Sequence, residues 1–163
     1  MTIRLATPAD AEAVATMLAR LAEETGDGAR FASTPATIRA HGFGPDALFE
    51  TLVAESRARL TGVAVFVRHF STTRGAPGVY VQDLWTAPDK RGQGLGAALL
   101  AGVVSHARNG WNARYLALTT HGHNAAARAF YRRFGFIAHP DDVPMTLDGA
   151  PFDALGARTK SAA

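Results

Sequence analysis

The sequence of 163 residues predicts a mixed α/β fold with an antiparallel first half. Apolar residues recur with strand periodicity in some segments and with helical spacing in others. Several of the strand-like segments follow one another with only short turns between them, as antiparallel strands do. No internal repeat, low-complexity stretch or linker divides the chain, and we expect one domain over residues 1–163.

The composition excludes several classes of protein. With 47% hydrophobic and 19% charged residues, the chain is expected to fold, and its length is sufficient for a core without a covalent staple. The absence of cysteine excludes disulfides, thiolate metal sites and cysteine nucleophiles. No apolar run approaches the length of a membrane span, and the first residues do not resemble a secretion signal. We therefore expect a cytoplasmic protein that binds no membrane.

A short strand at residues 2–6 opens the chain, and two helices follow. Residues 7–10, Thr-Pro-Ala-Asp, form a helix start, with Thr as the cap, Pro at the first helical position and an acid three residues after the cap. The apolar stripe of this helix has the spacing i, i+3, i+4, i+7 and consists of Val14, Met17, Leu18 and Leu21. A second helix is expected from residues 33–35 to about residue 41, before a stretch rich in Gly and Pro.

Strand-like runs follow at residues 48–55, 60–68 and 78–86, separated by polar turns. A Gly-rich turn then leads into a helix that we expect from residue 94 to about residue 108. A short strand is expected at residues 115–119.

The last part of the chain predicts a helix over residues 124–134 and then two further strands, at Phe136 and at residues 145–147. With these last two strand segments written as one β, the order of the predicted elements is β-α-α-β-β-β-α-β-α-β.

The charges are distributed unevenly along the chain. Residues 1–89 and 141–163 each carry a small excess of acidic residues, whereas residues 90–140 contain seven Lys and Arg, four His and no acid. A block without carboxylates indicates that this part of the protein meets an anion. Nucleic acid is not favoured, because dense Lys and interleaved aromatic residues are missing. A phosphorylated small molecule fits better.

The most specific motif is the glycine-rich loop RGQGLG at residues 91–96, between a predicted strand and a predicted helix. Glycines allow a tight turn, and the N–H groups and dipole at the start of the helix favour a phosphate. A dinucleotide-binding loop would open a βαβ unit and would be followed by an acid about 20 residues later. Neither condition holds here. The loop lies in the middle of the chain, after three mostly antiparallel strands, and the next acid after Asp89 is Asp141.

Residues 81–96, VQDLWTAPDKRGQGLG, resemble motif A of the GCN5-related N-acetyltransferases (GNAT). Residues 124–136, NAAARAFYRRFGF, are similar to the helix with Asn, Phe-Tyr and Gly-Phe that follows in that family. Within the superfamily, residues 41–44, 52–55 and 80–83 look most like the diamine (spermidine/spermine) acetyltransferase branch. The resemblance covers essentially the whole chain.

This resemblance implies the GNAT fold: a mixed, mostly antiparallel, twisted sheet of six or seven strands flanked by about four helices. It also implies direct transfer of acetyl from acetyl-CoA to an amine without a covalent enzyme intermediate. The absence of cysteine agrees, because no thioester to the enzyme can form. Carried over position by position, the residues that contact acetyl-CoA are Leu84, Trp85, Thr86, Arg91, Gly92, Gln93, Gly94, Leu95, Gly96, Ala97, Asn124 and Ala127.

The proton transfers need an acid and a base. Tyr131 matches the family's general acid, and a phenol of pKa about 10 is protonated at neutral pH and can protonate a departing thiolate. At the position of the base the chain departs from the family pattern, because the diamine branch has Glu-Asp where this chain has Gln82-Asp83, and Gln accepts no proton. Either Gln82 positions a water, or Asp83 or another acid acts as the base, or the substrate differs. Strand alternation would turn Gln82 and Asp83 to opposite faces, so Asp83 would not simply replace the missing Glu. A structural Asp83 paired with an Arg is an equal alternative.

The resemblance places the amine near the end of the first helix, at Glu23, Glu24, Thr25 and Asp27, and at Thr119; a solvated helix end is the other interpretation of these acids. We expect a small primary amine as substrate (a polyamine, a diamine or an amino-acid-like amine), no nucleic acid partner and a homodimer. We expect no metal, and interpret His121-x-His123 as a loop feature. Two alternatives remain open: acetylation of a protein or peptide amine, and a catalytically weak module that senses acyl-CoA.

Overall fold

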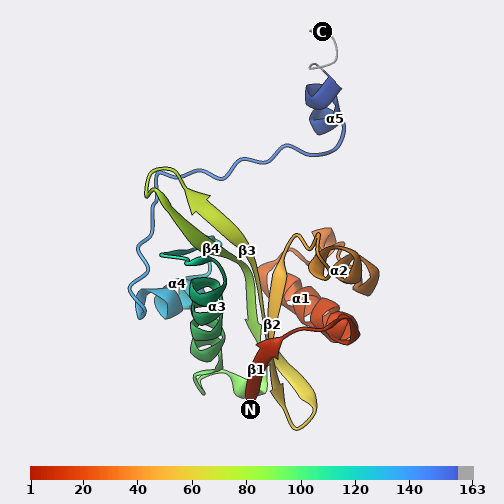
Figure 1. The fold of residues 1–163 in the computed structure, drawn as a ribbon, viewed down its shortest axis with the longest axis vertical. Helices are drawn as coiled ribbons and strands as arrows, with labels where there is room; N and C mark the ends of the chain where they lie inside the picture. Colours follow the sequence, from red (N-terminus) through yellow and green to blue (C-terminus); the bar gives the residue numbers. More distant parts are fainter. Residues whose placement is uncertain (158–163) are drawn as a thin grey trace. The chain divides into compact units, whose positions relative to one another are not determined.

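Five strands form a single sheet in the computed structural model, which describes residues 1–157, and their order in the sheet is their order in the sequence (Figure 1). The strands are β1 (Thr2–Leu5), β2 (Glu50–Ser56), β3 (Arg59–Ser71), β4 (Ala76–Thr86) and β5 (Leu116–Leu118). The first four pair antiparallel, whereas β5 pairs parallel to β4. A parallel neighbour requires a crossover, and helix α3 (Leu95–Trp111) supplies it.

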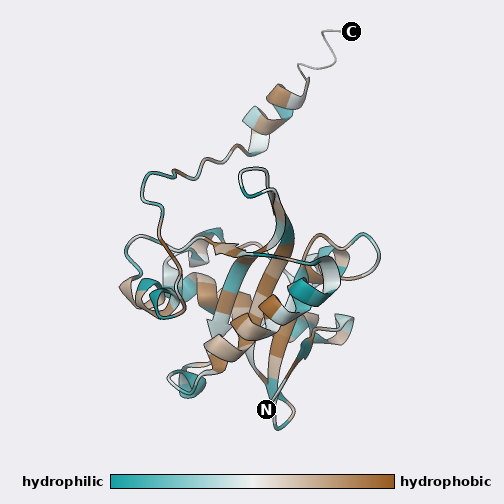
Figure 2. Ribbon diagram, turned by 60° about the vertical axis from the view of Figure 1, so that its left-hand side comes forward, coloured by the Kyte–Doolittle hydropathy of each residue, from teal (hydrophilic) through white to brown (hydrophobic). Residues whose placement is uncertain are grey.

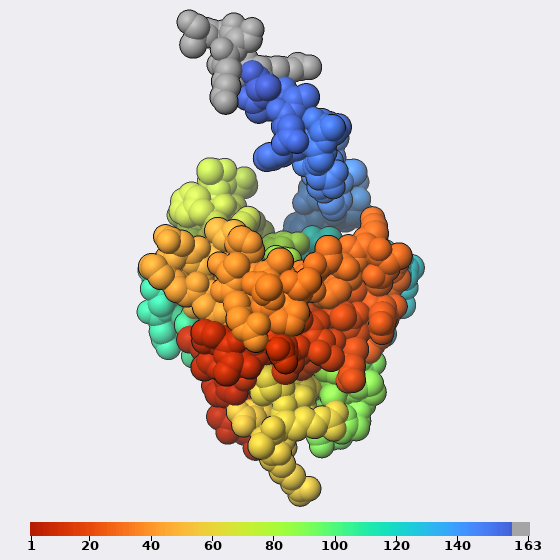
Figure 3. Space-filling model, turned by 90° about the vertical axis from the view of Figure 1, so that its right-hand side faces the viewer, coloured from red at the N-terminus to blue at the C-terminus, as the bar shows by residue number. Residues whose placement is uncertain are grey.

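Helices cover both faces of this sheet. Helices α1 (Ala11–Thr25) and α2 (Pro35–Gly42) lie on one face and α3 lies on the other (Figure 1). In Figure 3 the segments up to about residue 50, coloured red to orange, spread across the α1 side. Apolar residues are concentrated in the central strands, while the turns are mostly polar (Figure 2). The mixed, mostly antiparallel fold class predicted from the sequence is confirmed.

The core on the α1 face forms from the predicted stripe of α1 and from alternate residues of the central strands. Its members include Val14, Met17, Leu18, Val53, Val63, Val65 and Trp85. On the other face α3 approaches β3 closely at Gly62, where a Cβ atom would lie 2.9 Å from Leu99 Cδ1. A larger residue at position 62 would require the Leu99 side chain to shift.

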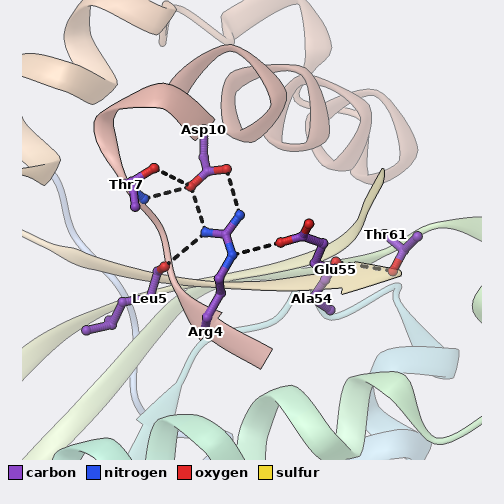
Figure 4. A network of polar contacts seen from close by, with 7 residues as sticks. All are labelled: Arg4, Leu5, Thr7, Asp10, Ala54, Glu55 and Thr61. Carbon is purple, nitrogen blue, oxygen red and sulfur yellow. Dashed lines mark hydrogen bonds and ion pairs between the residues drawn. The ribbon is translucent and has the colours of Figure 1, made fainter. Parts of the chain in front are cut away.

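The start of α1 is held by a polar network around Arg4 (Figure 4). Asp10 accepts a hydrogen bond of 2.7 Å from the Thr7 N–H, as the predicted cap requires, and two more from the Arg4 guanidinium at 2.8 and 3.0 Å. Arg4 Nε also donates to Glu55 at 2.8 Å. The guanidinium holds the pKa of Asp10 well below its usual value. The network ties β1, β2 and α1 together.

Strand β4 contains a bulge that the sequence did not predict. Val65 lies opposite Asp83 and Phe66 lies opposite Val81, which leaves Gln82 as an extra residue in β4. A bulge breaks the alternation of faces. Val81 shares the α3 face with Phe66, whose ring meets that of His106 in α3, whereas Asp83 shares the α1 face with Val65. The alternation argument made for Gln82 and Asp83 therefore does not hold here.

The chain divides into two compact units, residues 1–124 and a second unit that starts at Ala125. In the second unit, α4 (Ala125–Arg132) and α5 (Gly149–Ala157) are the helices among the described residues. The expected strands at Phe136 and at residues 145–147 are absent from the described structure, so the sheet has five strands instead of six or seven. Two prolines and two Asp in residues 139–144 favour turns, and they leave too short an apolar run for a ladder.

Candidate active site

Strands β4 and β5 separate halfway along β4. Their pairing is confined to residues 79–81 of β4 and 116–118 of β5. Beyond it, residues 82–86 have no strand partner on that side among the described residues. The Ala87 N–H donates to the Thr61 carbonyl, so the alternation of an antiparallel ladder directs the peptide groups of Leu84 and Thr86 to the open edge. The open edge is therefore able to pair with an extended, amide-containing ligand.

The open edge of β4 leads, through the short 3-10 turn Pro88–Lys90, into the glycine-rich loop. Gly92 and Gly94 have φ angles of 72° and 81°, which favour glycine, and α3 starts at Leu95. The backbone N–H groups of residues 92–97 donate no hydrogen bond to any residue within 1–157. Free donors at the positive end of a long helix suit a pyrophosphate. This is the arrangement that the sequence predicted for the loop.

Two side chains hold the loop in place. Gln93 Nε2 donates to the Asp89 carbonyl at 2.8 Å. Arg91 Nε donates to the Thr86 carbonyl at 3.1 Å, and Arg91 Nη2 donates to both carboxylate oxygens of Glu24 at 2.8 and 2.7 Å. Arg91 thus points to α1 and to the end of β4.

Glu24 and Thr25, which the sequence assigned to the substrate, both have partners within the chain. Trp85 Nε1 donates to Glu24 at 3.1 Å, in addition to the bonds from Arg91. Desolvation opposes ionisation of this carboxyl, but the hydrogen bonds from Arg91 and Trp85 outweigh it, and the pKa of Glu24 lies below its usual value. The Thr25 hydroxyl donates to the Leu21 carbonyl at 3.0 Å. The Trp85 indole is buried in the core, so only its backbone is available to a ligand.

Asp83 has the opposite environment. Its carboxyl is half-buried and forms no hydrogen bond or ion pair with a residue of the described chain. Desolvation raises the pKa of Asp83 to about 6. The structure therefore does not support the alternative in which Asp83 pairs with an Arg. Gln82 beside it is exposed. An unpaired carboxyl that titrates near neutral pH, in the strand with the open edge, is suited to accept a proton.

The end of β5 carries polar contacts of its own. Thr119 accepts a hydrogen bond of 3.0 Å from the Tyr80 hydroxyl. His121 Nε2 lies 2.9 Å from Asp27 Oδ2, which joins the segment after β5 to the segment after α1. Sequence reasoning missed this pair and the pairing of Glu24 with Arg91, because no periodicity reports contacts between distant segments. Within the described part of the chain, no group of three His, Asp or Glu side chains could hold a metal ion.

Two of the predicted site residues lie in the second unit. Tyr131 belongs to α4, and its ring packs against Phe130 and Phe136 with centroid distances of 5.2 and 5.3 Å. Desolvation raises the pKa of Tyr131 to about 12, so that its phenol remains protonated at neutral and mildly alkaline pH. Ala127 lies one turn earlier in α4, while Asn124 ends the first unit.

Comparisons with known proteins agree with this geometry. Residues 14–136 match the model of the acetyltransferase (GNAT) family. The chain is 30% identical over 115 residues to thialysine N-epsilon-acetyltransferase of Mus musculus, which covers 66% of this chain and 67% of that one. An integron cassette protein from the mobile metagenome of V. cholerae superposes with a TM-score of 0.78 at 20% identity, covering 95% of this chain and 96% of its own.

A further solved structure, ribosomal-protein-alanine N-acetyltransferase from Brucella melitensis biovar Abortus 2308, has a TM-score of 0.69. It is 19% identical and covers 91% of this chain and 100% of its own. At such identities the solved structures support the fold. In the described residues, no helix combines the length and the apolarity needed to cross a membrane.

Proposed function

The chain belongs to the acetyltransferase (GNAT) family, and on this premise we propose that it transfers acetyl from acetyl-CoA to a primary amine of a small molecule. The observation that carries the proposal is the open edge of β4, which leads directly to a loop of unpaired N–H donors at the start of α3. An extended amide arm followed by a pyrophosphate has the shape and chemistry that this edge and loop accept.

The residues present fit such a ligand. The peptide groups of Leu84 and Thr86 would pair with the pantetheine arm, and the N–H groups of residues 92–97 would hold the pyrophosphate. Asn124 and Ala127 complete the proposed set, in line with the family motif. When bound, acetyl-CoA supplies an activated thioester.

Asp83 is the proposed base. Its pKa of about 6 leaves it ionised at pH 7 yet basic enough to take a proton from a substrate ammonium. The freed amine attacks the thioester carbonyl carbon, a C–N bond forms, and the C–S bond breaks. The nitrogen then loses its second proton, which returns to the Tyr131 phenolate once the phenol has protonated the sulfur. Tyr131 donates its proton to the departing sulfur, which its pKa of about 12 permits, because a thiol has a pKa of about 8.5. Gln82 accepts no proton, and its proposed role is to orient the amine or a water.

The substrate class is proposed from the relative in mouse, which is named for the N-epsilon acetylation of thialysine, a small amine. Thr119, at the end of β5, offers a hydroxyl oxygen to such an amine. We also propose that the protein is a cytoplasmic homodimer. Light scattering on the purified chain tests the dimer, and a mass of one subunit would contradict it.

The experiment is release of free thiol from acetyl-CoA with a panel of polyamines, diamines, lysine analogues and aminoglycosides. Tyr131→Phe is compared with Tyr115→Phe, a matched loss of a hydroxyl that bonds to His69 instead. We expect one class of amine to be turned over, with a loss of about 10²–10⁴-fold for Tyr131→Phe only. CoA binding without turnover of any free amine would overturn the small-amine proposal and favour a protein substrate or a sensor.

A further inference from the structure

Glu24 occupies the last turn of α1, but its carboxylate faces the end of β4 and the start of the glycine-rich loop. Both oxygens accept from Arg91 Nη2, and one of them also accepts from the Trp85 indole. A carboxylate with these donors has little capacity left for a substrate ammonium. Its pKa is below the usual value, so it is ionised and paired at any pH at which an acetyltransferase would be assayed.

Arg91 is the first residue of the loop, and its guanidinium spans two structures. Nε donates to the Thr86 carbonyl, the last of β4, while Nη2 reaches Glu24. The Arg91 side chain therefore bonds back to the end of β4 and also fixes the start of the loop to α1. Trp85, the residue before Thr86, is buried in the core and gives Glu24 a rigid second contact.

The loop has few other restraints. The N–H groups of residues 92–97 have no acceptor within residues 1–157, and glycines with positive φ occupy two of these positions. A loop of this kind can adopt many conformations, and ordering it on binding costs affinity. Apart from the bond between Gln93 and Asp89, the Arg91 contacts are the side-chain bonds that restrain it in the described structure.

We propose that Glu24 is a positioning residue for the acetyl-CoA loop, acting through Arg91, and is not a ligand of the amine. This inference rests on the function proposed above. It reverses the role that the sequence suggested for Glu24. Because both side chains are partly exposed, at 40% for Glu24 and 46% for Arg91, we expect a moderate effect.

The test compares Glu24→Ala with Glu23→Ala, the same change on the same turn of α1, in CoA binding by calorimetry and in steady-state kinetics. Glu24→Ala is expected to raise the Kd for CoA and the KM for acetyl-CoA about tenfold, with the amine KM within about twofold of wild type. Glu23→Ala is expected to change neither the Kd for CoA nor the KM for acetyl-CoA. In an Arg91→Ala background, Glu24→Ala is expected to have no further effect on the Kd, because the two residues act as one unit.

Four results would overturn the inference. A raised amine KM with unchanged CoA binding would make Glu24 a substrate ligand. Unchanged CoA binding in Glu24→Ala would remove any positioning role, and a full effect in the Arg91→Ala background would show that Glu24 does not act through Arg91. If wild type bound no CoA at all, the proposed function would fail and this inference with it. Should Glu24→Ala unfold, Glu24→Gln keeps an acceptor for Trp85 and is expected to show a smaller rise of the same sign.

Discussion

Two carboxylates lie near the second half of β4, Glu24 in the last turn of α1 and Asp83 within β4 itself, and they differ in hydrogen bonding and in the direction of the pKa shift. Glu24, at the end of α1, accepts three hydrogen bonds from Arg91 and Trp85, and its pKa is lowered. Asp83, beside the bulge of β4, has no partner in the described chain, and its pKa is raised to about 6. Asp83 is a residue of β4, and Glu24 accepts a hydrogen bond from Trp85 of the same strand.

This difference separates a structural role from a chemical one. A paired carboxylate is stable in its charged form and gains nothing from a proton, so it holds other groups in place. An unpaired, desolvated carboxyl is close to balance between its two forms at neutral pH and can exchange a proton with a ligand. The sequence alone suggested a substrate role for Glu24, and either a proton-accepting role or a pairing with an Arg for Asp83.

The largest expected effect comes from Asp83→Asn, which removes the proposed base and retains the shape. We expect kcat to fall about 10²–10⁴-fold, and the acidic limb of the pH profile, with an apparent pKa of about 6, to disappear. Asp89 is an exposed acid three residues beyond β4, and Asp89→Asn is the control. This variant should keep the kcat of wild type and the acidic limb of the pH profile. A retained rate and pH limb in Asp83→Asn would remove the contrast with Glu24.

The stability of the same variant sharpens the comparison. The Asp83 carboxyl binds its proton more tightly in the folded chain than in the unfolded chain, so the folded state loses stability as the pH rises from about 4 to above 6. Asp83→Asn avoids this cost and should raise the free energy of unfolding at pH 8 by about 3 kcal/mol, with little change below pH 4. Urea unfolding at the two pH values measures it. Lower stability at pH 8 would contradict the desolvated carboxyl.

Asp10 provides a paired carboxylate far from the proposed site. Its pKa is depressed by Arg4, so its contribution is fully present above the unfolded pKa and is lost as the pH falls through acidic values. Asp10→Asn should cost about 1.5 kcal/mol at pH 7, through the lost ion pair and cap, and should leave the Kd for CoA unchanged. Thermal unfolding and calorimetry together test this, and weaker CoA binding would argue against a purely structural role.

The smallest expected effect comes from Trp85→Phe, which keeps the buried ring and removes one donor to Glu24. Because Arg91 still pairs with Glu24, we expect about a twofold rise in the Kd for CoA, close to the limit of calorimetric resolution. A rise as large as that of Glu24→Ala would mean that Trp85, and not Arg91, transmits the effect.

Local signals in the sequence were sufficient to predict much of the fold and the geometry of the glycine-rich loop. The Thr7–Asp10 cap, the stripe of α1 and the glycine-rich loop all follow from residues close together in the chain, and the structure has each of them. The pairing of Glu24 with Arg91 joins segments that only the tertiary fold brings together. The expected strands after residue 135 failed for a different reason, since short apolar runs there compete with Pro and Asp that favour turns.

The bulge at Gln82 was equally hidden, because it depends on the register of β4 against β3 and not on composition. Gln82 is an extra residue in the ladder, so the later residues of β4 face the side opposite to the one they would face in a regular strand. Without the bulge, Asp83 and Trp85 would both face α3 along with Val81. The indole would then be turned away from Glu24, and the unpaired carboxyl would leave the α1 face. One additional residue therefore sets the environment of both carboxylates.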